Sequence, residues 1–171
     1  MAAIREQLNA TRSHLLSVLE GLSDDQLNWK LDNFTWNIAQ VVQHIAIVEG
    51  GSPHAITLGL AQEPNFVPTD IPLEQLILDR SKKVNAPDRL HPSTDPKTMA
   101  QLKEILHDSQ EKFLGALNDI EITALLDKTS PPISHPVFGQ MSTGQWITAV
   151  PLHEERHIQQ IEELKERLQS R

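Results

Sequence analysis

Apolar side chains recur at helical spacing in two long segments of the N-terminal half of this sequence. Across residues 4–22 they lie at steps of three and four, and Gly21 is suited to end the helix. A second segment begins after Thr35 as "WNIAQVVQHIAIVEGG", and its paired glycines, Gly50 and Gly51, predict its end. Both patterns are typical of amphipathic helices that pack one face against a core.

Two more long helices are predicted in the C-terminal half. One follows Asp95-Pro96, which supplies a capping residue and a proline at the first helical position, and its apolar stripe continues to Leu117. The other runs from about Thr143 to the C-terminus. One of its faces carries the following side chains: Trp146, Val150, His153, His157, Ile161, Leu164 and Leu168.

The segments between these helices are shorter or irregular. The sequence "SDDQ", Ser23 to Gln26, has the form of a capping box and predicts one short helical turn. Between Pro53 and Pro96 the chain is rich in proline, and "SPHAITLGLA" and "PLEQLILDRSKKV" predict short additional helices. No stretch shows strand-like alternation of useful length. We therefore predict an all-α fold in one domain, residues 1–171, built as an up-down four-helix bundle with a long crossover between its second and third long helices.

Composition limits the partners of this domain. The chain has 15 Lys+Arg against 23 Asp+Glu, and the resulting charge of −8 disfavours nucleic acid and anionic membrane surfaces as partners. The absence of cysteine excludes disulfides, thiolate metal ligands and a thiol nucleophile supplied by the protein. No apolar run approaches the roughly 20 residues that span a bilayer, and the N-terminus lacks the apolar region of a secretory signal. We expect a cytoplasmic protein without nucleic-acid or membrane partners.

The last segment contains His-Glu-x-x-His, from His153 to His157, which is the signature of zinc metalloproteases. A protease of this type needs a third metal ligand further along the chain. The metzincin pattern requires glycine and histidine where Gln160 and Glu163 stand. The other zincin type takes a glutamate from a later helix, but the residues after His157 continue the same helix. The pattern therefore argues against a protease.

A di-iron carboxylate site is the second possibility. Glu104 and His107, with Glu154 and His157, give two Glu-x-x-His motifs on two helices of a bundle. At about 100° per residue, Glu104 projects roughly 160° from the centre of its helix's apolar stripe, so it should face water. The di-iron interpretation fails at this residue.

His153 and His157 form a candidate metal site that, unlike the protease and di-iron sites, the sequence does not exclude. They project within roughly 40° of the centre of the apolar face, where each polar nitrogen needs a partner. A metal ion can serve as the partner of both histidines, because histidines four residues apart place their rings on one side of a helix. The alternative is a pair of core histidines bonded to carboxylates or buried water. His44 lies at the edge of the stripe of the second long helix, and spacing alone makes it a candidate third ligand.

Four stretches of the sequence together resemble the DinB/YfiT-like family of four-helix-bundle metalloproteins. They are "LSDDQLNWK", "FTWNIAQVVQHI", "HPVFGQMSTGQW" and "HEERHIQQI", in this order along the chain. The resemblance implies a single DinB-like domain over residues 1–171. It also implies a divalent-metal site formed by one histidine of the second long helix and two of the fourth, which are His44, His153 and His157 here.

The resemblance also implies a type of activity. The metal is expected at the bundle axis, open to solvent at one end with water in its remaining positions, and zinc or nickel suits such imidazole ligands. Family members known as enzymes are mostly transferases or isomerases that use low-molecular-weight thiols, while others are described only as metal-dependent hydrolases. We therefore expect a small-molecule substrate and a thiol-dependent S-transferase or isomerase. A hydrolase using metal-bound water and a non-catalytic, metal-stabilised binding or interaction module are the alternatives. Homodimers are common in the family, which makes a homodimer a candidate assembly.

Three residues near the expected ligands are secondary candidates. Glu154 and Arg156 flank the ligand face at roughly 80° on either side, so either could reach a metal-bound water or an anionic substrate. The alternative is that both are solvated and pair with neighbouring helices. His135 could line the mouth of the site, but "HPVFG" is more simply explained as a structured loop.

Overall fold

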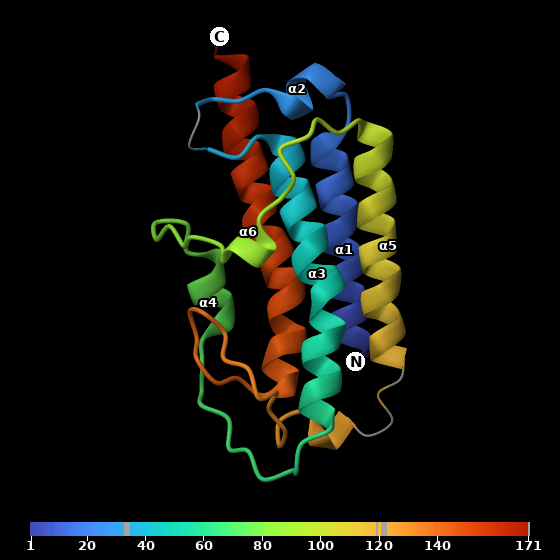
Figure 1. The fold of residues 1–171 in the computed structure, drawn as a ribbon, viewed down its shortest axis with the longest axis vertical. Coiled ribbons are helices and arrows are strands. Elements are labelled where there is room, and N and C mark those ends of the chain that lie inside the picture. Colours follow the sequence, from blue (N-terminus) through green and yellow to red (C-terminus); the bar gives the residue numbers. More distant parts are fainter. Residues whose placement is uncertain (33–34, 119, 121–122, 171) are drawn as a thin grey trace.

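Four long helices form a bundle in the computed structural model, which describes residues 1–32, 35–118, 120 and 123–170 (Figure 1). The long helices are α1 (Ala2–Leu19), α3 (Ile38–Leu60), α5 (Met99–Asn118) and α6 (Thr143–Gln169). The short elements are α2 (Asp24–Asn28), α4 (Leu73–Leu78) and the 3₁₀ turns η1 (Asp88–Leu90) and η2 (Thr123–Leu125). The predicted all-α four-helix bundle with a long crossover is confirmed. None of the helices within the described ranges is long and apolar enough to cross a membrane.

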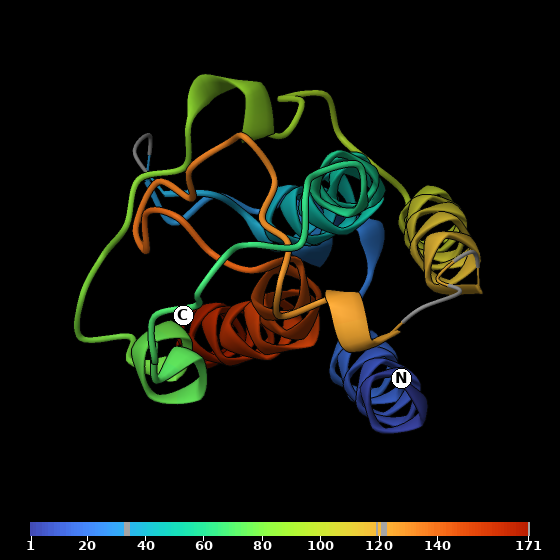
Figure 2. The same cartoon turned by 90° about the horizontal axis from the view of Figure 1, so that it is seen from below.

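The crossover sets the direction of the helices. Helix α3 packs against both α5 and α6, and α1 packs against α6, so the four axes surround one core (Figure 2). Helices α1 and α3 run in opposite directions, as do α5 and α6 (Figure 1). However, α3 and α5 run the same way, because the crossover carries the chain back to the end of the bundle at which α3 begins. Helix α4, within this crossover, packs on the outer side of α6.

Side-chain capping fixes the starts of α2, α3 and α6. Ser23, Asn37 and Ser142 each accept a hydrogen bond from the backbone N–H three residues on, and the glutamine there bonds back to the cap. The capping box predicted at Ser23 is therefore confirmed. Gly21, predicted to end the first helix, has a positive φ of 80°, a conformation that glycine adopts without steric cost.

The predicted end of the second long helix at Gly50-Gly51 is wrong. Helix α3 continues through both glycines and Pro53 to Leu60, so "SPHAITLGLA" is its last part and not a separate helix. Packing explains the difference, because the buried face continues with Ile56 and Gly59. A Cβ at Gly59 would lie 2.2 Å from the hydroxyl oxygen of Thr143, so α3 and α6 approach closely there.

Two further boundaries differ from the prediction. Helix α5 starts at Met99, and its N-terminal cap is not Asp95 but Thr98, whose hydroxyl accepts from the Gln101 backbone while the Gln101 side chain accepts from the Thr98 N–H. The stretch "PLEQLILDRSKKV" is helical only from Leu73 to Leu78. The rest of that stretch is turn and irregular chain that leads around the outside of the bundle to η1 (Figure 2).

The core consists of two large hydrophobic clusters along the bundle axis and a smaller one beneath α4. The cluster nearer α2 contains, among others, Leu15, Leu19, Val41, Ile45, Leu106, Ile158 and Ile161. The cluster nearer η2 contains Leu8, Ile56, Phe113, Leu117, Leu126, Ile147 and Val150. The smaller cluster joins Leu73 and Ile77 to Met141, Ala149 and Leu152.

Candidate metal centre

Three histidines from two packed helices converge inside the bundle. His44 lies on α3 and is 4% exposed, while His153 and His157 lie one turn apart on α6. The Nε2 atom of His153 is 3.2 Å from Nε2 of His44 and 3.1 Å from Nε2 of His157. The ligand atoms of all three lie within 4.8 Å of one another, and His153 is the most exposed of the three. The structure thus brings together the three residues that the sequence and the family resemblance predict as metal ligands.

Hydrogen bonds on the far side of two rings fix their tautomers. Nδ1 of His44 lies 2.9 Å from the carbonyl oxygen of Leu90, and Nδ1 of His157 lies 2.8 Å from Oε1 of Gln160. Because these oxygens accept, each Nδ1 carries the proton and each Nε2 presents a lone pair to the centre of the cluster. A metal-binding histidine is typically oriented in this way by its other nitrogen.

The donor set fits a divalent cation. Lone pairs of His44 and His157 both face Nε2 of His153, and a neutral imidazole has at most one proton there to share between them. A cation satisfies all three nitrogens at once. Bonds of about 2.0–2.1 Å in tetrahedral geometry would place zinc-bound nitrogens roughly 3.3 Å apart. The two short separations of 3.1 and 3.2 Å are close to that value.

Burial keeps the three imidazoles neutral. It lowers the pKa of His44, and it lowers the pKa of His157 to about 3. Burial also holds the pKa of His153 well below its ordinary value, and the neighbouring His157 and His44 add to the effect. The unprotonated nitrogens that a metal ion requires are therefore available near neutral pH.

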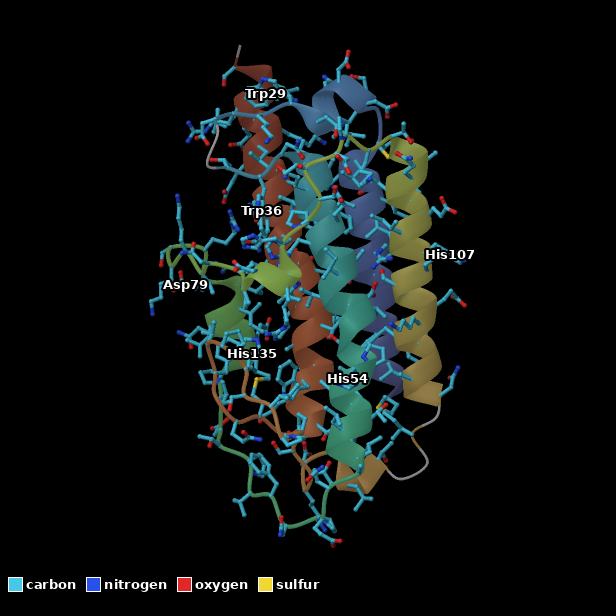
Figure 3. All side chains as sticks on the ribbon, viewed as in Figure 1. Trp29, Trp36, His54, Asp79, His107 and His135 are labelled. Carbon is cyan, nitrogen blue, oxygen red and sulfur yellow. The ribbon has the colours of Figure 1, made fainter. Side chains whose placement is uncertain are left out.

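A tryptophan ring packs beside one of the three histidines. The centroid of the Trp36 ring lies 4.9 Å from that of the His44 ring. The Trp36 ring also makes an edge contact with the His91 ring, at a centroid distance of 5.7 Å. Figure 3 shows Trp36 on the side of the bundle that carries the crossover, whereas His107 projects from α5 on the opposite side. Glu104 is exposed, as the helical projection predicts.

His135 occupies a tight loop beside α6. Reciprocal backbone hydrogen bonds with Gly139 close the loop, and Nδ1 of His135 accepts from the backbone N–H groups of Val137 and Phe138. Its ring stacks on Phe138 and meets the edge of Trp146 at 5.3 Å. Burial lowers the pKa of His135 to about 4. These contacts explain "HPVFG" as a structured loop, and the ring lies near enough to affect the pKa of His153.

Glu154 points into the bundle and is 2% exposed, so the alternative of a solvated side chain is wrong, although the carboxylate does pair with a neighbouring helix. Its Oε1 accepts from Nε of Arg12 at 2.7 Å, and its Oε2 accepts from the hydroxyl of Thr11 at 3.0 Å. Burial raises the pKa of Glu154, and the charge of Glu49 adds to this, while Arg12 and Thr11 oppose it. Both carboxylate oxygens are thus engaged with α1.

Arg156 binds the crossover. Its guanidinium donates to the backbone carbonyl oxygens of Ile77, Asp79 and Lys82 at 2.7 to 2.8 Å. Burial lowers its pKa, and the charge of Arg80 contributes. Like Glu154, it pairs with a neighbouring segment, and its contacts fasten the chain between α4 and η1 to α6. Asp79, one of these acceptors, marks that segment in Figure 3.

Two partners of the ligands were not predicted from the sequence. Gln160 follows His157 by three residues, which places both on one face of α6, so helical spacing could have indicated the contact. Leu90 could not have been found in this way. It acts through its backbone carbonyl, and the crossover brings it to His44 across 46 residues of sequence.

The fold and the candidate site together are of the DinB/YfiT type. They combine a four-helix bundle, a long crossover, and three histidines from α3 and α6 that converge on one point. The chain belongs to the DinB superfamily, whose sequence model matches residues 7–161. It is 29% identical over 161 residues to the uncharacterized protein YuaE of Bacillus subtilis (strain 168), a match that covers 94% of this chain and 96% of YuaE.

Two solved structures share the fold. YfiT from Bacillus subtilis, described as a probable metal-dependent hydrolase with an unusual four-helix bundle topology, superposes with a TM-score of 0.63 at 21% identity. That match covers 98% of this chain and 86% of YfiT. The four-helix bundle protein TT2238 gives a TM-score of 0.61 at 17% identity and covers 94% of this chain and 97% of its own.

Proposed function

We propose that this protein is a divalent-metal-dependent enzyme that acts on a small molecule, and that its nucleophile is a low-molecular-weight thiol. The observation that carries the proposal is the convergence of three neutral imidazole nitrogens, from His44, His153 and His157, on one point of the bundle. Three neutral ligands leave the full charge of a divalent ion in place. A bound ion of this kind lowers the pKa of a coordinated water and deprotonates a coordinated thiol.

The surroundings of the three histidines favour a thiol over water. The chain has no cysteine, so an attacking thiol must come from outside. Among the described residues, no Asp or Glu joins the three-histidine group, and the carboxylate next to it in sequence, Glu154, is bonded to Arg12 and Thr11. Hydrolysis typically uses a positioned general base, whereas a thiol that is already deprotonated needs none.

The residues around the ligands have separate tasks in this proposal. Leu90 and Gln160 hold the rings of His44 and His157 with Nε2 directed inward. His153 is the most exposed of the three ligands and marks the side from which thiol and substrate enter. Arg156 keeps the chain around Asp79 attached to α6 at the edge of the site.

Turnover that requires both thiol and metal is the expected result. A panel of electrophilic substrates would be incubated with the zinc- or nickel-loaded protein, with and without bacillithiol, mycothiol or glutathione. His157→Ala should abolish turnover, while His14→Ala, an exposed residue on α1, should leave it unchanged. Turnover that is independent of thiol would refute the proposed nucleophile.

A metal-dependent hydrolase is the second candidate. The description of YfiT, which has the same fold, favours it, and the same three nitrogens would support attack by water. In the substrate panel, this candidate predicts turnover that persists without thiol and is lost when the metal is removed.

Removing the metal should leave the helices intact. The bundle has two hydrophobic clusters that do not include the three histidines, and a chain of this length can stabilise its own core. Far-ultraviolet circular dichroism before and after treatment with EDTA tests this. A collapse of helicity would instead indicate a metal-stabilised binding or interaction module, as in small zinc domains that unfold without their ion.

A further inference from the structure

A layer of buried polar side chains separates the two large hydrophobic clusters of the bundle. Each long helix contributes one member: Arg12 from α1, Glu49 from α3, Ser109 from α5 and Glu154 from α6. On every helix this residue lies between a member of one cluster and a member of the other. On α1, for example, Arg12 lies between Leu8 and Leu15. We refer to these four residues as the polar layer.

The guanidinium of Arg12 contacts the other three long helices. Its Nε donates to Oε1 of Glu154 at 2.7 Å, and one terminal nitrogen donates to Oε2 of Glu49 at 2.8 Å. Its other terminal nitrogen donates to the backbone carbonyl oxygen of Leu106 on α5. Burial opposes the charged form, but Glu154 and Glu49 together raise the pKa of Arg12 above its ordinary value. Arg12 is therefore a permanent cation that is 5% exposed and shared between two carboxylates.

Burying these charged side chains in the core costs desolvation free energy. Two carboxylates share one guanidinium, and Oε1 of the 2%-exposed Glu49 has no hydrogen-bond partner among the described residues. The Ser109 hydroxyl donates to Oε2 of Glu49, the oxygen that Arg12 already contacts. A buried ion network of this kind can often be replaced by apolar side chains without loss of stability. Stability alone therefore gives no reason for the polar layer.

Its position suggests a different role. Glu154 directly follows the ligand His153 on α6, and Glu49 follows the ligand His44 by five residues on α3. Arg12 thus joins the two helices that supply the three histidines. A guanidinium presents its donors in a rigid plane, so it fixes the distance and register of the two carboxylates that it binds.

We propose that Arg12 is a positioning residue of the metal centre: by holding Glu49 and Glu154 it sets the placement of His44 relative to His153 and His157. The proposal rests on the metal site of the proposed function. It differs from a purely structural role, in which the polar layer only stabilises the fold. It also differs from a purely electrostatic role, in which the charge of Arg12 matters and its planar fork does not.

An apolar replacement of the layer separates positioning from stability. In the variant R12M/E49L/E154L, the hydroxyls of Ser109 and Thr11 keep the backbone carbonyl acceptors that they already have. We expect this variant to fold with an unfolding midpoint close to that of the wild type. Its zinc affinity, measured by competition with a chelator, should fall by about 10-fold or more. The visible spectrum of the cobalt-loaded variant should also change, which reports altered ligand geometry.

Two single variants complete the test. Arg12→Lys keeps the charge but not the planar fork, so it should also weaken zinc binding and alter the cobalt spectrum. Arg5→Met is the matched control, because Arg5 lies two turns earlier on α1, is only partly buried, and donates a hydrogen bond to the side chain of Asn118 outside the polar layer. It should bind zinc like the wild type.

Each outcome decides one question. Wild-type affinity and spectrum in R12M/E49L/E154L would overturn the positioning role, and a triple variant that cannot fold would assign the polar layer to fold stability instead. Wild-type behaviour of Arg12→Lys would replace the geometric role with an electrostatic one. Absence of bound metal from the wild-type protein would refute the proposed function itself, which the other outcomes leave standing.

Discussion

Replacing His157 with alanine should remove the metal from this protein while leaving its fold intact. We expect the purified wild type to hold about one divalent ion per chain, since three donors suffice for an open site. The variant loses one of the three converging nitrogens, and with it the ring that Gln160 orients. Loss of a direct ligand should cost more than the roughly 10- to 100-fold in affinity that loss of an orienting partner costs. Elemental analysis and titration with zinc measure this effect.

The comparison with His14→Ala makes the result specific. His14 is an exposed histidine of α1 that lies 3.6 Å from Glu155, so its removal changes the histidine content without touching the three-histidine group. It should retain the wild-type metal content. Equal metal binding by His157→Ala and the wild type would mean that the ion binds elsewhere, and a wild-type protein without metal would leave the three histidines as a buried polar cluster.

The metal-free protein should lose stability steeply as the pH falls below neutrality. In the folded chain the pKa of His157 is lowered to about 3, whereas an unfolded chain titrates its histidines near 6.5. Below the unfolded value, the unfolded state binds a proton that the folded state excludes, so the free energy of unfolding decreases until the folded pKa is reached. His157 alone should contribute about 1.4 kcal/mol to this loss between about pH 7.5 and pH 5.5. His44 and His153, whose pKa values are also lowered, should add to it.

Urea unfolding of the EDTA-treated protein across this pH range tests the prediction. The difference between the wild type and His157→Gln isolates one histidine, because every other titrating group is common to both proteins. The variant should show the shallower decrease in stability, and His14→Gln should follow the wild type. Parallel pH profiles for wild type and His157→Gln would contradict the buried, neutral state of this ring.

Sequence periodicity was sufficient to predict the bundle because the core positions of each long helix repeat every three or four residues. It failed where tertiary packing outweighs local preference. Gly50, Gly51 and Pro53 are poor helix formers, yet they lie within α3 because the following turns bury Ile56 and Gly59 against the rest of the bundle. The predicted start of α5 was wrong for another reason. Asp95-Pro96 and Thr98 are both plausible helix starts in the sequence, and only the hydrogen bonds of the structure identify Thr98 as the cap.

Some residues of the candidate site could likewise be predicted from the sequence, and others could not. His153 and His157 share one helix, so their common face follows from spacing, whereas the choice of His44 required the family resemblance. The partners of Glu154 could not have been predicted at all, because Arg12 is 142 residues away in sequence and helical projection says nothing about which helix lies opposite. Projection placed Glu154 beside the ligand face, but only the packing of α1 against α6 shows that this position is buried.

The crossover links the fold to the site. Its return path places η1 against α3, where the carbonyl of Leu90 holds His44, and its earlier part carries the three carbonyl acceptors of Arg156. A direct connection between α3 and an antiparallel neighbour would supply neither contact. The direction of α5 and the orientation of the His44 ring therefore have one cause in this bundle.

X-ray absorption spectroscopy of the zinc-loaded protein tests the three-histidine centre most directly. We predict a first shell that contains three imidazole nitrogens at about 2.0–2.1 Å, with the outer-shell scattering of imidazole rings. His157→Ala, treated with zinc in the same way, should retain little zinc, and any zinc that it does retain should lack the three-imidazole shell. A zinc ion bound mainly by carboxylate oxygens, or by fewer than three imidazoles in the wild type, would contradict the centre formed by His44, His153 and His157.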